Sequence, residues 1–217
     1  MRVDQLSRRE NGDIFFHTFN TSEPRKAKLL LVNGSKDLTE DWDWYIDLKL
    51  IYPKAHIISA SSNFSNNENA YRHYLEATAI EADDAQLEAW AINLNHGADV
   101  SEVGRKLAEN VDRDRLQHLM VYTNGNSSVC RRVKESINEY FEDKTIYTGG
   151  LAWSSYSGGK GFIGLDEDIR EGNLVAIAFY GEEGKGINPE LNKLINFVGR
   201  QLLPQQQNGE YPLMRAS

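Results

Sequence analysis

Three polar loops hold the residues of this sequence best suited to chemistry, and each loop follows an apolar segment that reads as a strand. They span Ser59–Asn67, Thr123–Ser128 and Gly149–Ser157. Serine hydroxyls and asparagine amides can hydrogen-bond a small polar ligand, although the same residues also cap helices and form turns. Where neighbouring strands run in one direction, their carboxyl ends share the sheet edge at which ligands of open α/β sheets usually bind. We therefore expect one ligand site at that edge.

The predicted site combines hydrogen-bonding side chains with a helix start and a flexible backbone. Ser127 stands before an apolar helical stripe, where free N–H groups favour a carboxylate or phosphate. Gly149 and Gly150 either let a ligand approach the backbone or satisfy a positive φ at a strand end. The ligand-binding residues we expect are Ser61, Ser62, Asn124, Asn126, Ser127, Gly149, Gly150 and Trp153.

Signals for catalysis or metal binding are missing from the sequence. It has no Gly-x-Ser-x-Gly motif, and the glycines between Gly181 and Gly186 lack the spacing of a phosphate-binding loop. The five histidines show no metal-ligand spacing. Cys130, the single cysteine, reads as a small core residue early in a helix. We therefore expect a binding protein, not an enzyme, with no catalytic residue, no metal and no cofactor.

Apolar runs alternate with stretches of helical period, which is typical of an α/β protein. A helix is expected after Thr39, with Trp42, Ile46 and Leu50 at intervals of four. The segments Tyr74–Ile80 and Leu87–Leu94 read as an antiparallel pair around a short turn. Because the order is not a pure βαβ alternation, we expect a mixed twisted β-sheet covered by helices. A four-layer α-β-β-α sandwich of two sheets is the alternative.

Length and charge restrict the class of protein. The 217 residues favour one domain over residues 1–203, followed by a flexible tail at 204–217. A formal charge of −8 is the wrong sign for coating nucleic acid or an anionic membrane, so we expect neither as a partner. No apolar stretch approaches the ~18 residues of a membrane span. We interpret the protein as cytoplasmic.

Five segments in order resemble the FIST N-terminal domain family, a sensory domain of prokaryotic signalling chains. They are KLLLVNGSKDL, YPKAHIISASS, DVSEVGRKLAENV, LMVYTNGNSS and TIYTGGLAWSSYSGGKGFIGLDEDIREGNLVAIAFYG, and they cover roughly Ala27 to Gly181. The sequence departs from the family at three turns. Ser59–Ser65 replaces a Gly-Cys-Ser-Thr-Ala-Gly-Glu-like turn, Asn124 replaces an aspartate before glycine, and no acidic residue stands near Trp153. These changes make the expected pocket less acidic.

The resemblance implies an intracellular sensor for a small amino-acid-like or other carboxylated metabolite. It also implies coupling to a signalling partner or following domain such as a kinase, a cyclic-dinucleotide enzyme or a chemoreceptor. One alternative from the same resemblance is a haem-based nitric oxide sensor, for which His73 or His96 would supply the axial ligand. Another is an enzyme acting on a small carboxylated substrate. Any association between chains is expected to use the C-terminal helix or an exposed strand.

Overall fold

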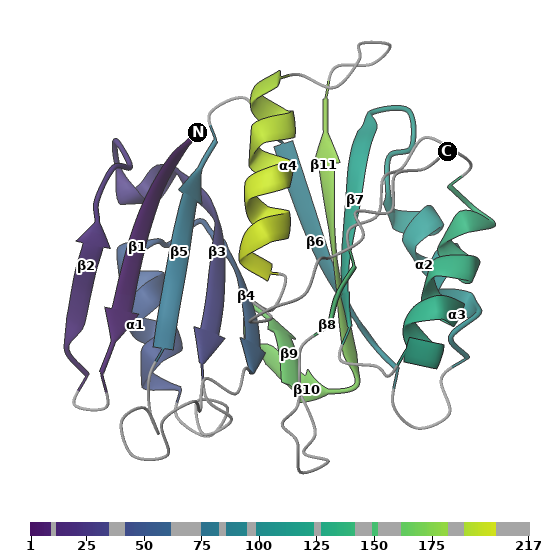
Figure 1. The fold of residues 1–217 in the computed structure, drawn as a ribbon, viewed down its shortest axis with the longest axis horizontal. Coiled ribbons are helices and arrows are strands. Elements are labelled where there is room, and N and C mark those ends of the chain that lie inside the picture. Colours follow the sequence, from purple (N-terminus) through teal and green to yellow (C-terminus); the bar gives the residue numbers. More distant parts are fainter. Residues whose placement is uncertain are drawn as a thin grey trace, which may run out of the picture.

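In the computed structural model of the chain, the described residues are 1–9, 12–34, 42–61, 75–82, 86–94, 99–123, 127–141, 149–151, 162–181 and 189–202. Within these ranges the chain forms two β-sheets and four α-helices, arranged in layers (Figure 1). A single 3-10 turn, Pro24–Lys26, precedes the third strand. The tail expected after residue 203 lies outside the described residues.

The larger sheet has seven strands in the order β10-β9-β4-β3-β5-β1-β2. β3 and β4 are parallel, and the other neighbours are antiparallel. β3 lies in the middle because its run Ala-Lys-Leu-Leu-Leu-Val is apolar almost throughout, as expected of a strand covered on both faces. The strand bounds are β1 (Arg2–Arg8), β2 (Ile14–Thr18), β3 (Ala27–Gly34), β4 (His56–Ser61), β5 (Leu75–Glu81), β9 (Phe162–Leu165) and β10 (Asp168–Glu171).

The smaller sheet has four strands in the order β6-β11-β7-β8. β7 and β8 are parallel, whereas β11 is antiparallel to both β6 and β7. Every residue of β11 is buried, which fits its central position. The strands are β6 (Gln86–Asn93), β7 (Leu116–Thr123), β8 (Gly149–Leu151) and β11 (Asn173–Tyr180).

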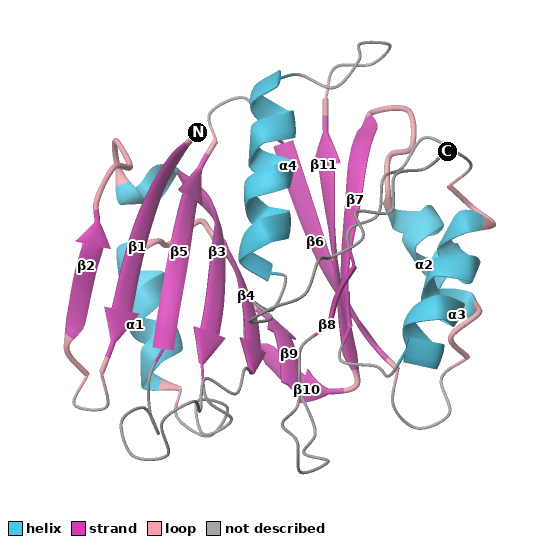
Figure 2. Cartoon of the chain, viewed as in Figure 1, coloured by secondary structure: helices cyan, strands magenta, loops and turns pink. Residues whose placement is uncertain are grey.

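Helices cover the outer face of each sheet (Figure 2). α1 (Asp43–Ile51) buries Trp44 and Leu48 against the larger sheet. α2 (Glu102–Asn110) and α3 (Ser127–Asn138) pack on the smaller sheet. Burying each large apolar side chain contributes roughly 1.5–3 kcal/mol, so these two outer cores hold the helices in place.

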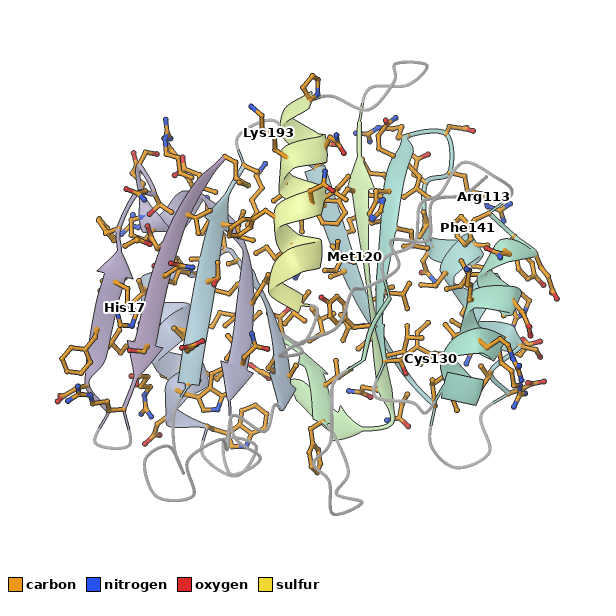
Figure 3. All side chains as sticks on the ribbon, in the orientation of Figure 1. His17, Arg113, Met120, Cys130, Phe141 and Lys193 are labelled. Carbon is orange, nitrogen blue, oxygen red and sulfur yellow. The ribbon has the colours of Figure 1, made fainter. Side chains whose placement is uncertain are left out.

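A third core joins the inner faces of the two sheets with α4 (Pro189–Leu202). Leu194 and Val198 of α4 are buried there beside Met120 of β7, and Figure 3 shows Met120 next to this helix. The apolar stripe of α4 is thus occupied by the chain's own core. This stripe is therefore not free to contact another chain, and the expectation of association through this helix or an exposed strand stays a prediction.

Buried acids of β1 and β5 hold the segment between β2 and β3. The Asp4 carboxylate is fully buried and accepts hydrogen bonds from the Thr21 N–H at 2.9 Å and the Thr21 hydroxyl at 2.7 Å. It also accepts one from the Tyr52 hydroxyl at 2.8 Å. Glu81, equally buried, accepts the Ser22 N–H at 2.6 Å. Because buried carboxylates are costly unless fully paired, these contacts fix the segment between β2 and β3.

The α/β class with a mixed sheet and covering helices is confirmed. The strands divide between two sheets, the arrangement given above as the alternative. The expected hairpin of Tyr74–Ile80 with Leu87–Leu94 is wrong, because β5 pairs with β1 and β3 whereas β6 pairs with β11. β5 lies between β1 and β3, and these two neighbours occupy both of its hydrogen-bonding edges.

The prediction of which side of the first helix is buried is also wrong. Trp42, Ile46 and Leu50 are exposed, while Trp44 and Leu48 on the opposite side are buried. The helix carries large apolar residues all round, so both stripes follow the same spacing. Packing against the sheet selects the one with Trp44.

Candidate functional site

Three of the predicted site residues lie at one end of the smaller sheet. Gly149 and Gly150 are in β8, where they pair in parallel with Val121 and Tyr122 of β7. Ser127 is the first residue of α3, the helix that follows β7. The glycine strand thus pairs with the carboxyl-terminal residues of β7, and the helix start is the next described residue after that strand. Ser62, Asn124, Asn126 and Trp153 lie outside the described residues.

Ser61 belongs to the larger sheet. It is the last residue of β4 and pairs in parallel with Gly34, the last residue of β3. The arrows of β3 and β4 point to the lower end of the molecule in Figure 1. β7 runs antiparallel to β11, whose arrow points up, so β7 and β8 also end at the lower end. The carboxyl ends of both parallel pairs thus face the same end of the molecule, although they lie in different sheets.

The start of α3 offers a favourable place for a negative charge. Helix starts leave backbone N–H groups without an intrahelical partner and carry partial positive charge. No acidic residue stands in the first turn of α3. Arg131 and Arg132 follow in the next turn, largely exposed, and their ion pairs reach Glu135 at 4.0 Å and Asp99 at 3.5 Å. A carboxylate bound here would meet donors and positive potential without an opposing acid on the helix start.

A buried amide pair at the same end was not predicted from the sequence. The Asn93 amide donates to the Asn173 side-chain oxygen at 2.8 Å across the β6–β11 pairing, and Asn173 is fully buried. Asn173 is on the same face of β11 as Val175, which packs in the core between the sheets. The available signal was an asparagine at the start of the otherwise apolar run Leu174–Tyr180. These residues extend the polar end of the smaller sheet into the space between the sheets.

Ser59 adds a buried hydroxyl near the end of β4. It is 6% exposed, and its oxygen has no hydrogen-bond partner within the described ranges. Leaving a buried polar group without a partner costs about 1–3 kcal/mol. Ser59 pairs with Val32 and Gly164, two residues before the predicted site residue Ser61. Its side of the sheet is the one covered by α1, since the alternate residue Ile57 packs in that core.

Nucleophilic and metal chemistry find little support in the described ranges. Burial raises the pKa of the Cys130 thiol, which disfavours the reactive thiolate; Figure 3 labels this residue on α3. Burial lowers the pKa of His118 to about 4, so its imidazole is neutral at pH 7 and packs against Phe179. No group of three or more His, Cys, Asp or Glu residues in the described ranges could hold a metal ion. His73 and His96, considered above as haem ligands, lie outside those ranges.

A charge network ties the β9–β10 turn to β4 and α1. Asp166, in the left-handed region at φ 52°, accepts the Ile57 N–H at 3.0 Å. Its carboxylate also forms an ion pair with Lys49 at 3.0 Å and a hydrogen bond with the His56 ring at 3.2 Å. The Asp166 N–H in turn donates to the Ile57 carbonyl at 2.7 Å. Burial alone would raise the pKa of Asp166, but hydrogen bonds from His56, Ile57 and Lys49 lower it to about 2. The Asp166 carboxylate is therefore ionised at pH 7, and its contacts anchor the β9–β10 turn to β4 and α1.

Comparison with known proteins identifies the family. No curated protein matches the chain. The model of the FIST N domain matches residues 28–191, which run from β3 into α4 and leave only β1 and β2 of the described strands outside. Among the described residues, no helix combines the length and apolarity needed to cross a membrane. FIST N domains are sensory domains that accompany signalling domains. With most of its length matched, the chain belongs to the FIST N domain family.

Proposed function

We propose that this FIST N domain binds a small carboxylated metabolite, such as an amino acid, at the carboxyl ends of β4, β7 and β8. The observation that carries the proposal is the position of α3: its start, free of acidic residues, follows β7, the strand that pairs in parallel with the glycine strand β8. A carboxylate in that position gains on the order of 1 kcal/mol from the helix end. Ser127, Gly149 and Gly150 would line this part of the site, and Ser61 would approach from the other sheet.

The ligand's remaining polar groups need partners of their own. Ser62, Asn124 and Asn126, which follow β4 and β7 in the sequence, would supply hydroxyl and amide groups, and Trp153 would supply apolar contact. Asn124 occupies the place of an aspartate in the family pattern, so an anionic ligand meets less repulsion there. Loss of a well-placed donor should weaken binding by about 1–3 kcal/mol where its partner is left buried. Recognition by such a set requires no chemical step on the ligand.

Ligand identity can be tested directly on the purified chain. Native mass spectrometry should detect a retained small molecule, and calorimetry with free L-amino acids should find a binder. The matching amine without its carboxylate serves as the control ligand and should bind at least about tenfold more weakly, since it lacks the anion. If acid and amine bind equally, the carboxylate has no role. If no amino acid binds and no molecule is retained, the proposed ligand class is wrong.

The role of the helix start can be separated from general loop effects by two variants at one position. Asn124→Asp places a negative charge near the proposed carboxylate, whereas Asn124→Ala only removes the amide. Asn124→Asp should therefore weaken binding of the anionic ligand more than Asn124→Ala, by an amount that decreases at high salt. Equal or tighter binding by Asn124→Asp would contradict an anion at this position.

A further inference from the structure

Strand β2 forms an edge of the larger sheet in the part of the chain that the structure describes. Residues 14–22, which include this strand, contain no Asp, Glu, Lys or Arg, although such residues make up 26% of the chain. Three phenylalanines on this segment are exposed: 39% for Phe15, 43% for Phe16 and 58% for Phe19. An exposed edge presents unpaired backbone N–H and C=O groups, so an uncharged aromatic edge is suited to pairing with another strand.

The opposite edge of the same sheet has a different composition. β10 reads Asp-Ile-Arg-Glu, and charged residues are a common protection of edge strands against pairing. β2 reads Ile-Phe-Phe-His-Thr and has neither such a charge nor a proline. Of the two edges, only β2 therefore lacks the usual protection.

Apolar side chains emerge on both faces of β2. Phe16 lies opposite Leu6, which packs in the core under α1, so Phe16 is on the face that α1 covers. Phe15 lies opposite Ser7 and is on the other face, as is His17, whose ring contacts the Ser7 hydroxyl at 2.9 Å (Figure 3). The Phe16 and Phe19 rings meet edge to face at 5.4 Å. Both faces of this edge strand therefore carry exposed apolar area.

We propose that β2 pairs antiparallel with β2 of a second copy of this chain, centred on Phe16, and extends the sheet across the two molecules. Each copy has a formal charge of −8, so most surfaces of two copies repel one another, whereas the uncharged segment 14–22 does not. A partner selected by charge would need complementary ionic groups on this strand, and residues 14–22 offer none. The guanidinium that lies over the Phe15 ring at 4.4 Å belongs to Arg9, which directly follows β1. Identical antiparallel strands are complementary about a two-fold axis, which places Phe16 beside Phe16 of the second copy.

This pairing has a definite consequence for the assembly. The two-fold axis of an antiparallel strand pair is perpendicular to the sheet, so both α1 helices lie on the same face of the extended sheet. The carboxyl ends that carry the candidate ligand site then point in opposite directions, because one copy is inverted relative to the other. The hairpin of β1 and β2, which makes this contact, lies outside the matched range 28–191.

Sedimentation of the full chain tests the pairing. Wild-type protein at about 100 µM should sediment at twice its 24.6 kDa mass. Phe16→Lys brings like charges together at the two-fold axis and should weaken dimerisation at least about tenfold. Leu50→Lys is the matched control, because Leu50 is an exposed apolar residue on α1 and not on β2, and it should leave the dimer intact. A monomeric wild type, or dissociation by Leu50→Lys but not by Phe16→Lys, overturns the proposal.

A disulfide cross-link between two copies is a second test, and it detects the contact without destabilising the dimer. In a Cys130→Ser background, Phe16→Cys should form a disulfide-linked dimer on mild oxidation, whereas Leu50→Cys should stay largely monomeric. Circular dichroism and the unfolding midpoint check that each variant is folded. Cross-linking through Leu50→Cys alone would assign the contact to α1 and refute pairing through β2.

Discussion

The ionised Asp166 should make the unfolding free energy of this domain decrease at acid pH. The Asp166→Asn variant measures the size of that contribution. Asparagine keeps the shape of the side chain and tolerates the left-handed φ of 52° about as well as aspartate does. The substitution therefore removes the charge that faces Lys49 and His56 without adding backbone strain.

The expected magnitude follows from the pKa. Hydrogen bonds from His56, Ile57 and Lys49 outweigh the opposing effect of burial and lower the Asp166 pKa from 3.8 to about 2. That difference, 3.8 − 2 or about 1.8 units, corresponds to about 2.4 kcal/mol at 1.36 kcal/mol per unit. The side chain is 32% exposed, so solvent screening reduces the contribution to about 1–2 kcal/mol. Because the folded pKa lies below the unfolded one, this stability is present above about pH 4 and is lost as the pH falls toward 2.

Urea unfolding from pH 7 to pH 2.5 measures this contribution as the difference in unfolding free energy between wild type and Asp166→Asn. The difference should be about 1–2 kcal/mol at pH 7 and should shrink below pH 4. Glu167→Gln removes a charge from the exposed neighbour in the same turn and should change stability by less than about 0.5 kcal/mol. Equal stability of wild type and Asp166→Asn at pH 7, or a difference that stays constant down to pH 2.5, would refute the assigned role of the charge.

Four further substitutions test the packing. Tyr52→Phe removes one donor from the buried Asp4 carboxylate and should cost about 1.5–3 kcal/mol, measured by urea unfolding. Leu48→Ala should cost about 2–5 kcal/mol because Leu48 is fully buried. Leu50→Ala, at a residue 77% exposed on the same helix, should stay within about 0.5 kcal/mol, and similar losses at both would contradict the phase of α1. Gly104→Ala would place its Cβ 1.9 Å from the backbone carbonyl oxygen of Ser136 in α3. The midpoint of thermal unfolding should therefore fall by several degrees. An unchanged midpoint would show that α2 and α3 separate easily.

Central strands were predictable from the sequence because their composition is compatible only with a buried strand. The segments of β3, β7 and β11 are apolar over most of their length. Such residues are buried on both sides of the strand only where other layers cover both faces of the sheet. β1 gave no such signal. Asp4, Ser7 and Arg8 are buried in it through polar partners, and polar residues do not mark a buried strand in a hydropathy pattern.

Strand pairing was not predictable from the same patterns. β5 and β6 are consecutive and separated by a short connection, which is typical of a hairpin, yet they belong to different sheets. Alternation of apolar and polar residues states which face of a strand is buried but does not name its neighbour. For the same reason, one sheet and two sheets fitted the sequence equally well.

The candidate site shows what local sequence patterns predict and what they do not. Ser127, Gly149 and Gly150 were expected to meet because they follow or form strands that end at one edge, and β7 and β8 are parallel neighbours that end together. Ser61 satisfies the same rule through β3 and β4, but the rule applies within a sheet and cannot place two sheets relative to each other. What aligns them is the shared core in which Ile58 of β4 and Tyr122 of β7 pack with α4, a contact between residues far apart in the chain. Local spacing therefore predicts each half of the candidate site, and long-range packing decides that the two halves face the same end of the molecule.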